Sequence, residues 1–492
     1  MSGSRFERIV GVETEFGTLT DCPEFSNPEQ AVAAIKDAVF YDLKLGLIDR
    51  HARDDVFEPA LSGGFLMNGG RLYIDAVGSH LEYATAESRT IKDAIAHDRA
   101  GHRIITQALR GLALQDKVSV YNNSVDHFGG HTFGSHENYL TVMEEDFFSH
   151  QVNELIPFLV TRQIFAGVGR VGGHRLDAVA KRPSYDEVMA NPVDYIWVSQ
   201  VYGVEPDSTV NFQLSQRADH IIKSVASRVR FNRALINPKW EHFYSHDRMQ
   251  RLHLLFGESN QMEFAFALKL GTTRLVLHLI EDRVLDSSIW LDSPLYALRE
   301  ISRDQTFEWR VTMADGSESD AVSVQRRYLE LAQGYRGMSA EGDWTLDAWQ
   351  QTLDALERDP LSLGDRLDWV AKRAMVETFK EDAGIDWTDD VLHSIDLEYH
   401  NLDPERSLHR ALVESGQAQR FVTDLDIIEA MTEPPSDTRA AGRGKLIRRV
   451  LQRKNPRFYV FDWNGASTER HEFLEFSDPF HTYEEVVPPQ ES

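Results

Sequence analysis

The feature that most constrains this chain is a strand-like stretch near the N-terminus, residues 5–16, in which apolar and polar residues alternate. Successive side chains of an extended strand point to opposite faces, so Glu13 and Glu15 project side by side from one face. The residues expected on the other face are Val12, Thr14 and Phe16. This strand therefore needs a sheet with one polar face and one buried face.

Residues 71–75 repeat this division, and the segment at residues 80–85 follows them closely. The side chains expected on the polar face are Arg71, Tyr73 and Asp75, with Leu72 and Ile74 on the apolar face. If these strands share a sheet, one face gathers hard oxygen ligands, namely Glu13, Glu15, Tyr73, Asp75 and Glu82. Such ligands suit Mg²⁺, which in turn suits nucleotide phosphates. The alternative reading of each strand alone is an ordinary solvated sheet face.

The charge of the chain argues against nucleic acid or an anionic membrane as its main partner. The sequence holds 52 Lys and Arg residues against 78 Asp and Glu residues, a formal net charge of −26, whereas binding to phosphates needs a basic surface. Cys22 is the single cysteine, which excludes an intrachain disulfide and a thiolate zinc site. The start lacks the apolar core of a signal peptide, and no long apolar run follows. We therefore expect a cytoplasmic protein.

Hydrophobic periodicity predicts a chain that mixes strands and helices. The helices are expected at residues 27–45, 90–114, 150–165, 262–281, 344–357, 367–381 and 389–400. Further strands are expected at residues 118–122, 135–142, 212–220, 252–257 and 458–463. Residues 173–210 have little periodicity and are interpreted as an insertion.

Common catalytic motifs are missing from the sequence. Residues 167–172 match the dinucleotide-binding fingerprint, but they follow a helical pattern and open no helix, so we do not interpret them as a nucleotide loop. The sequence contains no P-loop, no Gly-x-Ser-x-Gly elbow and no zinc-protease helix. What remains is carboxylate, Tyr, Arg and His chemistry, which binds metal and phosphate. Taken alone, His136 and His253 could equally be structural, and Arg217 and Arg439 could be ion pairs.

Seven ordered motifs spread over nearly the whole chain resemble the family of Pup ligases and depupylases. They are GVETEFG at 11–17, RLYID at 71–75, EYATAE at 82–87, GSHENY at 134–139, PFLVTRQ at 157–163, LSQR at 214–217 and PPSDTR at 434–439. The resemblance implies an α+β fold like that of glutamine synthetase, with a curved antiparallel sheet that holds ATP and Mg²⁺ and is backed by helices. It also implies a catalytic domain at 1–415 and a small C-terminal domain at 416–492.

The activity implied by the resemblance joins a small protein modifier to other proteins. The γ-phosphate of ATP passes to the side-chain carboxylate of the C-terminal Glu of a Pup-like modifier. A lysine of a protein substrate then takes the acyl group, which forms an isopeptide bond. The depupylating branch of the family instead cleaves that bond or deamidates the modifier.

The resemblance also implies roles for individual residues. Asp75 matches the catalytic aspartate of the family. Three residues match its metal ligands, namely Glu13, Tyr73 and Glu82. Three more fall where the family contacts ATP, namely Arg71, Thr85 and Trp463. The further active-site candidates are Glu15, His136, Arg217, Lys239, His253 and Arg439.

The residues of these motifs resemble those of the ligases more than those of the depupylases. Residues 13–17 (ETEFG), 77–80 (VGSH) and 367–370 (LDWV) resemble ligases, and the long depupylase loop before residue 71 is absent or much shortened. The sequence departs from the ligase pattern where Leu81 replaces a usual Pro and where Lys239 replaces an Arg. Three alternatives therefore stay open: an isopeptidase or deamidase, a ligase or phosphotransferase for a small carboxylate, and a non-catalytic nucleotide-sensing scaffold.

Overall fold

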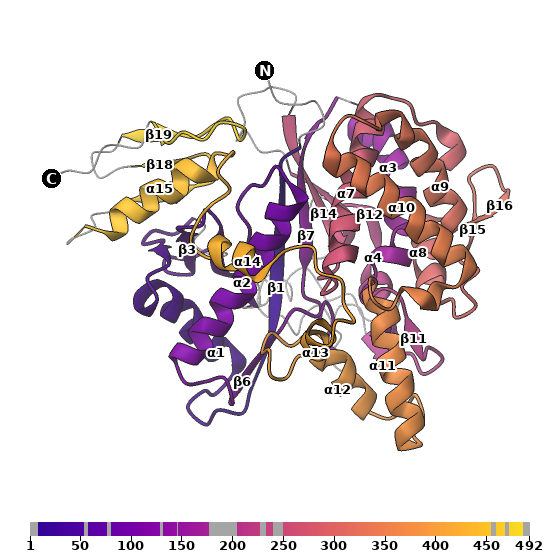
Figure 1. Ribbon diagram of the computed structural model, residues 1–492, viewed down its shortest axis with the longest axis horizontal. Helices are drawn as coiled ribbons and strands as arrows, with labels where there is room; N and C mark the ends of the chain where they lie inside the picture. The colour runs from indigo at the N-terminus through magenta and orange to yellow at the C-terminus, as the bar shows by residue number, and fades with distance from the viewer. Residues whose placement is uncertain are drawn as a thin grey trace, which may run out of the picture.

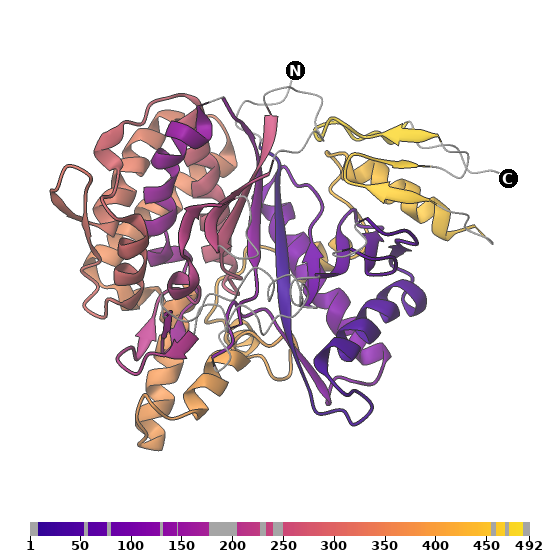
Figure 2. The same ribbon diagram turned by 180° about the vertical axis from the view of Figure 1, so that it is seen from behind.

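A computed structural model describes most of the chain, namely residues 8–53, 58–75, 80–127, 131–144, 146–176, 204–226, 233–239, 249–453, 459–467 and 472–485. Within these ranges the centre of the molecule is a ten-stranded sheet with helices packed against it (Figures 1 and 2).

The long strand β1 (Val10–Thr20) lies near the middle of this sheet. On one side of β1 the order is β7 (Ser135–Val142), β14 (Met249–Gly257), β13 (Ala234–Pro238) and β12 (Lys223–Val225). On the other side it is β5 (His80–Ala84), β4 (Arg71–Asp75), β3 (Gly63–Leu66) and β2 (Gly46–Ile48), and β6 (Val118–Tyr121) extends β1. Neighbouring strands are antiparallel except for the parallel pair β12 and β13. The expected antiparallel sheet is thus mixed at one edge.

The alternation predicted for the first strand is confirmed. Val10, Val12 and Phe16 are buried, whereas Glu13 and Glu15 stay partly exposed on the opposite face. The apolar face packs against α1 (Pro28–Asp37), α2 (Ile91–Gly111) and α7 (Glu263–Glu281). Thr90 caps α2 by accepting a hydrogen bond from the backbone of Asp93. The polar face, with Glu13 and Glu15, lies on the other side of the sheet.

A helical layer encloses the largest apolar core. It contains α3 (Val152–Thr161), α4 (Gln163–Ala166), α8 (Pro294–Arg303), α9 (Ala321–Ala332), α10 (Ala340–Arg358), α11 (Asp368–Ala383) and α12 (Val391–Glu398). The expected helices at 90–114, 262–281, 344–357, 367–381 and 389–400 are confirmed to within a few residues. The expected helices at 27–45 and 150–165 are each built from an α-helix and a π-helical turn, Ala38–Asp42 after α1 and Phe147–Gln151 before α3.

The C-terminal segment returns to the N-terminal end of the sheet. After α13 (Leu408–Glu414) and α14 (Asp424–Ala430), α15 (Ala440–Leu451) lies against β2 and β3. A small sheet follows, formed by β17 (Val460–Asp462), β18 (Gly465–Ser467) and β19 (Phe473–Glu475). Phe65 of β3 joins Ile447, Phe461 and Phe476 in one buried cluster. Residues more than 380 positions apart thus share a core, as the yellow and indigo segments of Figure 2 show.

The prediction of a strand at residues 212–220 is wrong. Residues 212–220 form only a two-residue strand, β11 (Phe212–Gln213), and then a turn of 3₁₀ helix at Ala218–His220. Side chains take over the backbone hydrogen bonds that a longer strand would use: the Oγ of Ser215 accepts from the backbone of Ala218 at 3.0 Å, and Glu258 accepts from the backbone of Arg217 at 3.1 Å.

The dinucleotide-like stretch at 167–172 opens no helix and instead contains the short strand β8 (Arg170–Val171), which pairs with β11. The middle of the expected insertion at 173–210, residues 177–203, lies outside the described residues. The described ends of this segment pair as β9 (His174–Leu176) and β10 (Val204–Pro206). The domain boundary near residue 415 stays a prediction.

Candidate functional site

The register of three strands sets the geometry of the polar face. Glu15 on β1 lies opposite Glu82 on β5, and Glu82 lies opposite Tyr73 on β4. In the next row, Ala84 separates Glu13 from Arg71. Directly paired residues of antiparallel strands point to the same side. The pairing therefore gathers side chains from positions 13–82 of the chain on one face.

Glu13 is held by side chains of β7 and β14. It accepts hydrogen bonds from Asn138 at 3.1 Å and from Arg251 at 3.2 Å, and the Nδ1 of His136 lies 3.2 Å from its other oxygen. The Nε2 of His253 is 3.4 Å from that same oxygen. Burial raises the pKa of Glu13, but the positive and hydrogen-bonding side chains around it outweigh burial and hold the pKa well below its usual value. The carboxyl group of Glu13 is therefore ionised at neutral pH.

Glu15 has a separate set of partners at the next position along β1. Its carboxylate accepts a hydrogen bond from the backbone of Gly134 at 2.7 Å and lies 3.3 Å from the Nδ1 of His80. Burial raises its pKa, yet these contacts and the nearby His136 lower it to about 2. A Cβ on Gly134 would come within 2.4 Å of the His136 ring and 2.6 Å of the Glu15 carboxylate, so a larger residue here would displace both side chains.

Glu82 is the carboxylate whose negative charge is least balanced by its neighbours. It is buried, and its burial together with the negative charges of Asp75, Glu15 and Glu13 raises its pKa well above the usual value. Tyr73 hydrogen-bonds to Glu82, and burial together with the negative charges of Glu82 and Glu13 raises the pKa of Tyr73 well above its usual value. Such crowding of oxygen donors is relieved by a cation.

The described residues contain two groups of side chains close enough to share a metal ion. One consists of Glu15, Glu82 and His136, and the other of Glu13, His136 and His253, with the donor atoms of each group within 4.8 Å of one another. The acidic oxygens of Glu13, Glu15 and Glu82, with the hydroxyl of Tyr73 beside them, fit a hard divalent ion such as Mg²⁺. Burial lowers the pKa of His253 to about 3, although Glu13 beside it opposes this shift.

A cavity of about 330 Å³ opens beside these carboxylates. Its lining brings together seven of the residues singled out in the sequence, namely Glu13, Arg71, Tyr73, Thr85, Lys239, Arg439 and Trp463. They come from four separate parts of the chain. Because carboxylates, cations and an indole ring meet here, the cavity has the mixed chemistry that a nucleotide requires.

Arg71 and Trp463 form one wall of this cavity. The guanidinium of Arg71 lies 2.9 Å from Glu58 and 3.3 Å from Asp49, and it stacks 4.5 Å from the centre of the Tyr73 ring. The ring of Trp463 packs edge-on against Phe65 with 4.9 Å between ring centres. The wall is therefore fixed by ion pairs and aromatic contacts.

Thr85 fixes the floor of the cavity. Its hydroxyl accepts a hydrogen bond from the backbone of Val12 at 3.0 Å, and its own backbone N–H donates to the carbonyl of Val12 at 2.9 Å. This double contact continues the pairing of β1 and β5 beyond the last residue of β5.

Arg439 is anchored by a carboxylate that follows β5. Its Nε donates to Glu87 at 2.7 Å, and Arg443, one turn later on α15, pairs with the same carboxylate. Burial raises the pKa of Glu87, but the two guanidinium groups lower it to about 2. The three residues link α15 to the central sheet.

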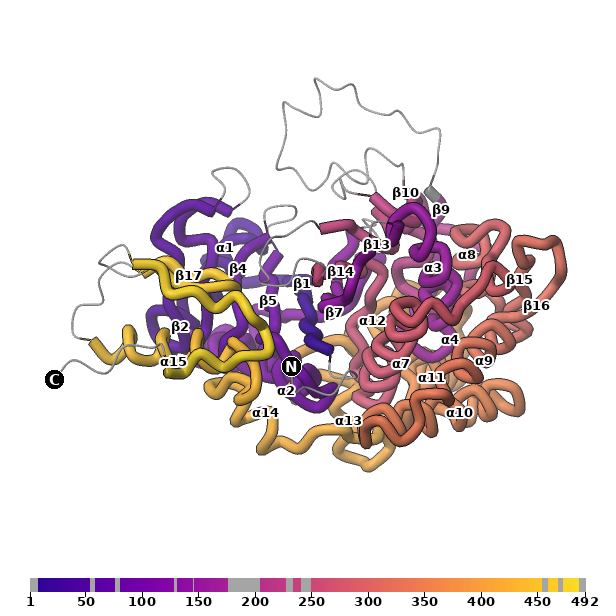
Figure 3. The backbone as a smooth tube through the Cα atoms, turned by 90° about the horizontal axis from the view of Figure 1, so that it is seen from above, coloured from indigo at the N-terminus to yellow at the C-terminus, as the bar shows by residue number. Residues whose placement is uncertain are grey.

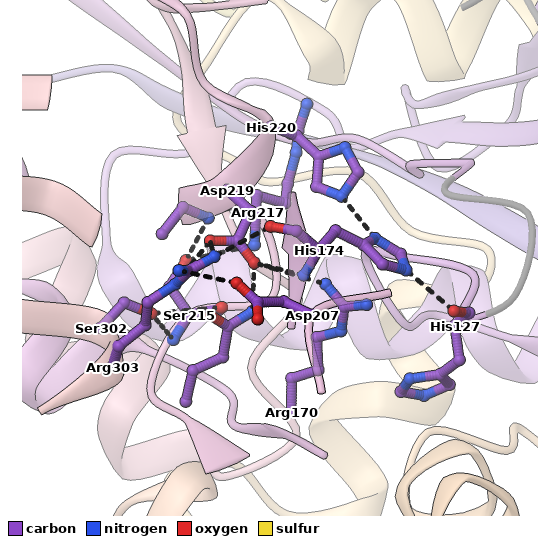
Figure 4. A network of polar contacts seen from close by, with 12 residues as sticks. His127, Arg170, His174, Asp207, Ser215, Arg217, Asp219, His220, Ser302 and Arg303 are labelled. Atoms are coloured by element: carbon purple, nitrogen blue, oxygen red, sulfur yellow. Dashed lines mark hydrogen bonds and ion pairs between the residues drawn. The ribbon is translucent and has the colours of Figure 1, made fainter. Parts of the chain in front are cut away.

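Arg217 is a predicted site residue that neither lines the cavity nor belongs to the groups that could share a metal ion. It is buried and donates to the backbone carbonyl of Leu255 on β14 at 2.6 Å. Figure 4 shows it within a polar network where the Nδ1 of His174 lies 3.0 Å from the Nε2 of His220 and Arg303 pairs with Asp219 at 2.7 Å. Leu255 lies two residues after His253 on β14, so Arg217 contacts the strand that carries His253.

Several residues at the site carried no signal that singled them out in the sequence. They are Arg53, Glu58, His80, Asn138 and Arg251, all in contact with a predicted site residue or the cavity. Asn138 and Arg251 lie on strands that alternate, so their face could have been assigned, but not their partner across the sheet. The spacing of four between Arg439 and Arg443 was a readable signal, because residues at that spacing share a helix face.

Comparison with known proteins gives a consistent assignment. The sequence model of the family described as Pup-ligase protein matches residues 8–467. The chain is 33% identical to the Pup deamidase/depupylase of Mycolicibacterium smegmatis, over 95% of this chain and 94% of that protein. It is 35% identical to the Pup--protein ligase of Kineococcus radiotolerans, over 93% and 92% of the two chains.

Two solved structures share the fold. The ligase PafA in complex with the prokaryotic ubiquitin-like protein Pup has a TM-score of 0.78 at 28% identity and covers 98% of this chain and 90% of its own. PafA in complex with ADP has a TM-score of 0.72 at 28% identity and covers 94% and 92%. The predicted α+β fold, a large sheet backed by helices, is confirmed. In the described part of the chain, no helix is both long and apolar enough to cross a membrane. By sequence and by fold, the chain belongs to the Pup-ligase family.

Proposed function

We propose that this chain is an ATP-dependent carboxylate-amine ligase that attaches a Pup-like modifier to lysines of other proteins. It would transfer the γ-phosphate of ATP to the side-chain carboxylate of the modifier's C-terminal Glu and then form an isopeptide bond with a lysine amine. The observation that carries this proposal is the cluster of Glu13, Glu15 and Glu82 beside the cavity lined by Arg71, Thr85 and Trp463. A metal site and a nucleotide site meet there, as phosphoryl transfer requires.

We assign Mg²⁺ to Glu13, Tyr73 and Glu82. Their crowded oxygen atoms and the raised pKa of Glu82 support this assignment. When bound, the ion would neutralise charge on the nucleotide phosphates. Glu15, His136 and His253 surround the proposed ligands and hold Glu13 ionised or shape the row beside it.

We assign the nucleotide to the cavity. Arg71 would contact phosphate oxygens with its planar fork, while Trp463 offers an aromatic face and Thr85 a short polar wall. Lys239 and Arg439 add positive charge to the same cavity. Arg217, which lies outside it, is proposed to support β14 near His253 through its bond to Leu255.

We assign the catalytic base to Asp75. It is the last residue of β4, and its charge is close enough to raise the pKa of Glu82. A lysine arrives as an ammonium ion and must lose a proton before its nitrogen can attack the activated carbonyl. Asp75 would accept that proton, after which the new carbon–nitrogen bond forms and phosphate leaves.

The ligase direction is favoured over isopeptide cleavage by the sequence before β4. Only residues 49–62 connect β2 to β3, which leaves no room for the long loop of the depupylating branch. The second candidate remains cleavage or deamidation, because relatives of both names align over most of the chain. We also propose a cytoplasmic location, which fractionation of producing cells would test.

The decisive experiment measures ADP formation by the purified chain with Mg²⁺ and ATP, with and without a Pup-like peptide ending in Glu and a lysine-bearing acceptor. Peptide-dependent ADP release and a covalent lysine adduct are expected. Asp75→Asn should lower conjugation by about 10²- to 10⁴-fold while nucleotide binding is retained. Asp382→Asn, an exposed carboxylate at the end of α11, is the matched control and should retain full activity.

Other outcomes identify the alternatives. Release of free target from a modified substrate, with ATP required but not consumed at each turnover, would identify the isopeptidase. ADP release that depends on a small acid and not on the peptide would identify the small-carboxylate enzyme. Tight Mg²⁺-dependent ATP binding without turnover would identify a nucleotide-sensing scaffold.

A further inference from the structure

A second cavity, of about 430 Å³, lies on the helical side of the sheet. It is bounded by one face of α2, by α13 and by the start of α14, which packs on α2 (Figures 1 and 3). The carboxylate cluster lies on the opposite face of the sheet. The two cavities share no lining residue.

The lining of this second cavity is strongly basic, although the whole chain carries a net charge of −26. Five arginines and two histidines line it, namely Arg99, Arg103, Arg110, Arg410, Arg420, His102 and His409. The acidic residues of the lining are Glu263 and Asp424. Positive charge is therefore concentrated here against the general trend of the molecule.

Two of these arginines are held by carboxylates beside the cavity. Arg99 pairs with Asp98 at 2.6 Å and also donates to the backbone carbonyl of Asn260. Arg410 pairs with Glu414, one turn later on α13, at 2.9 Å. These pairs orient the guanidinium groups and leave further donors on each fork.

The other three arginines differ in their partners. Arg103 and Arg420 share the carboxylate of Asp424, at 2.5 and 3.5 Å, and Arg420 also pairs with Glu263 at 2.8 Å. Arg110 is exposed at the end of α2 and has no side-chain hydrogen bond or ion pair among the described residues. Donor groups therefore outnumber the acceptors available to them.

The two histidines of the lining have lowered pKa values. Burial lowers the pKa of His409 to about 3, and the guanidinium groups of Arg99, Arg420 and Arg410 lower it as well. Burial lowers the pKa of His102 to about 4, while Asp98 opposes this shift and Arg99 adds to it. A bound anion would offset the field of the three guanidinium groups at His409.

We propose that this cavity binds a small organic molecule that carries a di- or triphosphate group. Arginine forks match phosphate oxygens in pairs, and the hydroxyl of Ser407, which accepts from the backbone of Arg410, can donate beside them. Val413, Ile427 and Met431 line an apolar wall that suits the organic part of such a ligand. A long polyanion such as nucleic acid would meet the negative surface outside the cavity.

The cavity is connected to the strand of the carboxylate cluster. The carboxylate of Asp98, which holds Arg99, accepts a hydrogen bond at 3.1 Å from the hydroxyl of Thr14, the residue between Glu13 and Glu15. The carboxylate of Asp98 therefore joins the cavity to β1, so a ligand that moves Arg99 would also change the contact with Thr14.

Isothermal titration calorimetry of the full chain with inorganic pyrophosphate, in EDTA to exclude divalent metal, tests the proposal. Wild type should bind pyrophosphate with an affinity that falls as salt is raised. Arg103→Gln together with Arg110→Gln should weaken binding at least tenfold, because two charged hydrogen-bond donors are lost. Arg310→Gln together with Arg327→Gln removes the same charge from exposed positions elsewhere and should leave the affinity unchanged.

Two further measurements test where pyrophosphate binds and whether the cavity prefers phosphate to carboxylate groups. Lys239→Gln changes the nucleotide cavity only and should not affect pyrophosphate binding in EDTA. Citrate should bind at least tenfold more weakly than pyrophosphate. The proposal is overturned if wild type fails to bind, if the two double variants behave alike, if Lys239→Gln abolishes binding, or if citrate binds as tightly. None of these readouts requires turnover, so they do not depend on the ligase proposal.

Discussion

At the scale of single residues, Glu82 is the side chain that a bound cation would stabilise most clearly, because it is buried among negative charges. Its neighbours on the face are Glu15 and Tyr73, and Asp75 lies close enough to raise its pKa. A carboxylate in such surroundings is costly unless a positive charge is supplied.

Glu82→Gln should therefore raise the Mg²⁺ concentration needed for half-maximal ADP release by about tenfold or more, because one charged ligand is lost. A titration of ADP release against Mg²⁺ at fixed ATP measures this. Glu330→Gln, exposed on α9, should leave the Mg²⁺ requirement unchanged. An unaltered requirement in Glu82→Gln would remove this residue from the metal site.

Lys239 lines the proposed nucleotide cavity, at a position where the resemblance to the family implies an arginine. Lysine supplies a point charge and not a planar fork. Lys239→Ala should raise the KM for ATP by about tenfold, which corresponds to about 1.4 kcal/mol. Lys239→Arg should keep the KM for ATP at or below the wild-type value, because arginine keeps the positive charge and adds hydrogen-bond donors.

Steady-state kinetics with varied ATP measures both variants. Lys223→Ala, an exposed lysine on the edge strand β12, is the matched control. If Lys239→Ala leaves the KM for ATP unchanged and instead changes the KM for the peptide, Lys239 contacts the modifier and not the nucleotide.

At the scale of secondary-structure elements, the contact of α15 with the sheet depends on one buried carboxylate. Glu87 pairs with Arg439 and Arg443, and the carbonyl of Gly69 accepts two further bonds from Arg443. Glu87→Gln would leave two buried guanidinium groups without their counter-charge. We expect a loss of about 3–5 kcal/mol in the free energy of unfolding at pH 7, measured by urea denaturation.

The same carboxylate predicts a pH dependence. The pKa of Glu87 is lowered from 4.5 to about 2 in the folded chain, so its stabilising effect is complete above pH 4.5 and is lost as the pH falls towards 2. The difference corresponds to about 3 kcal/mol. The gap in unfolding free energy between wild type and Glu87→Gln should therefore narrow between pH 5 and pH 3. A constant gap over this range would contradict the assignment.

At the scale of the whole molecule, the segment after residue 415 completes both the core and the cavity. Arg439 and Trp463 line the nucleotide cavity, and the backbone N–H groups of Phe421 and Val422 donate to the carboxylate of Glu263 on α7. The proposed boundary near residue 415 thus separates regions that depend on each other.

A chain cut after residue 415 should lose cooperative unfolding, because Glu87 and Glu263 would keep buried charges without their partners. Circular dichroism during heating measures this, with a chain cut after residue 485 as the control. A truncated chain that unfolds cooperatively at the wild-type temperature would show that residues 1–415 fold independently.

The sequence by itself determined which residues share a face. Period-two alternation placed Glu13 with Glu15 and Tyr73 with Asp75, and the 3.6-residue period located α2 and α7. These are properties of the local backbone, so they can be read without knowing the partners. The same local rules were wrong at 212–220, because Glu258, which is distant in sequence, binds the backbone there.

Only the tertiary structure decided which faces meet. The register that aligns Glu15, Glu82 and Tyr73, and the return of α15 that places Arg439 and Trp463 in the cavity, depend on packing between segments far apart in the chain. The basic cavity behind the sheet is a further case, since its arginines come from α2, α13 and the segment before α14. Local periodicity does not predict which distant segments pair, because that pairing depends on the free energy of the whole core.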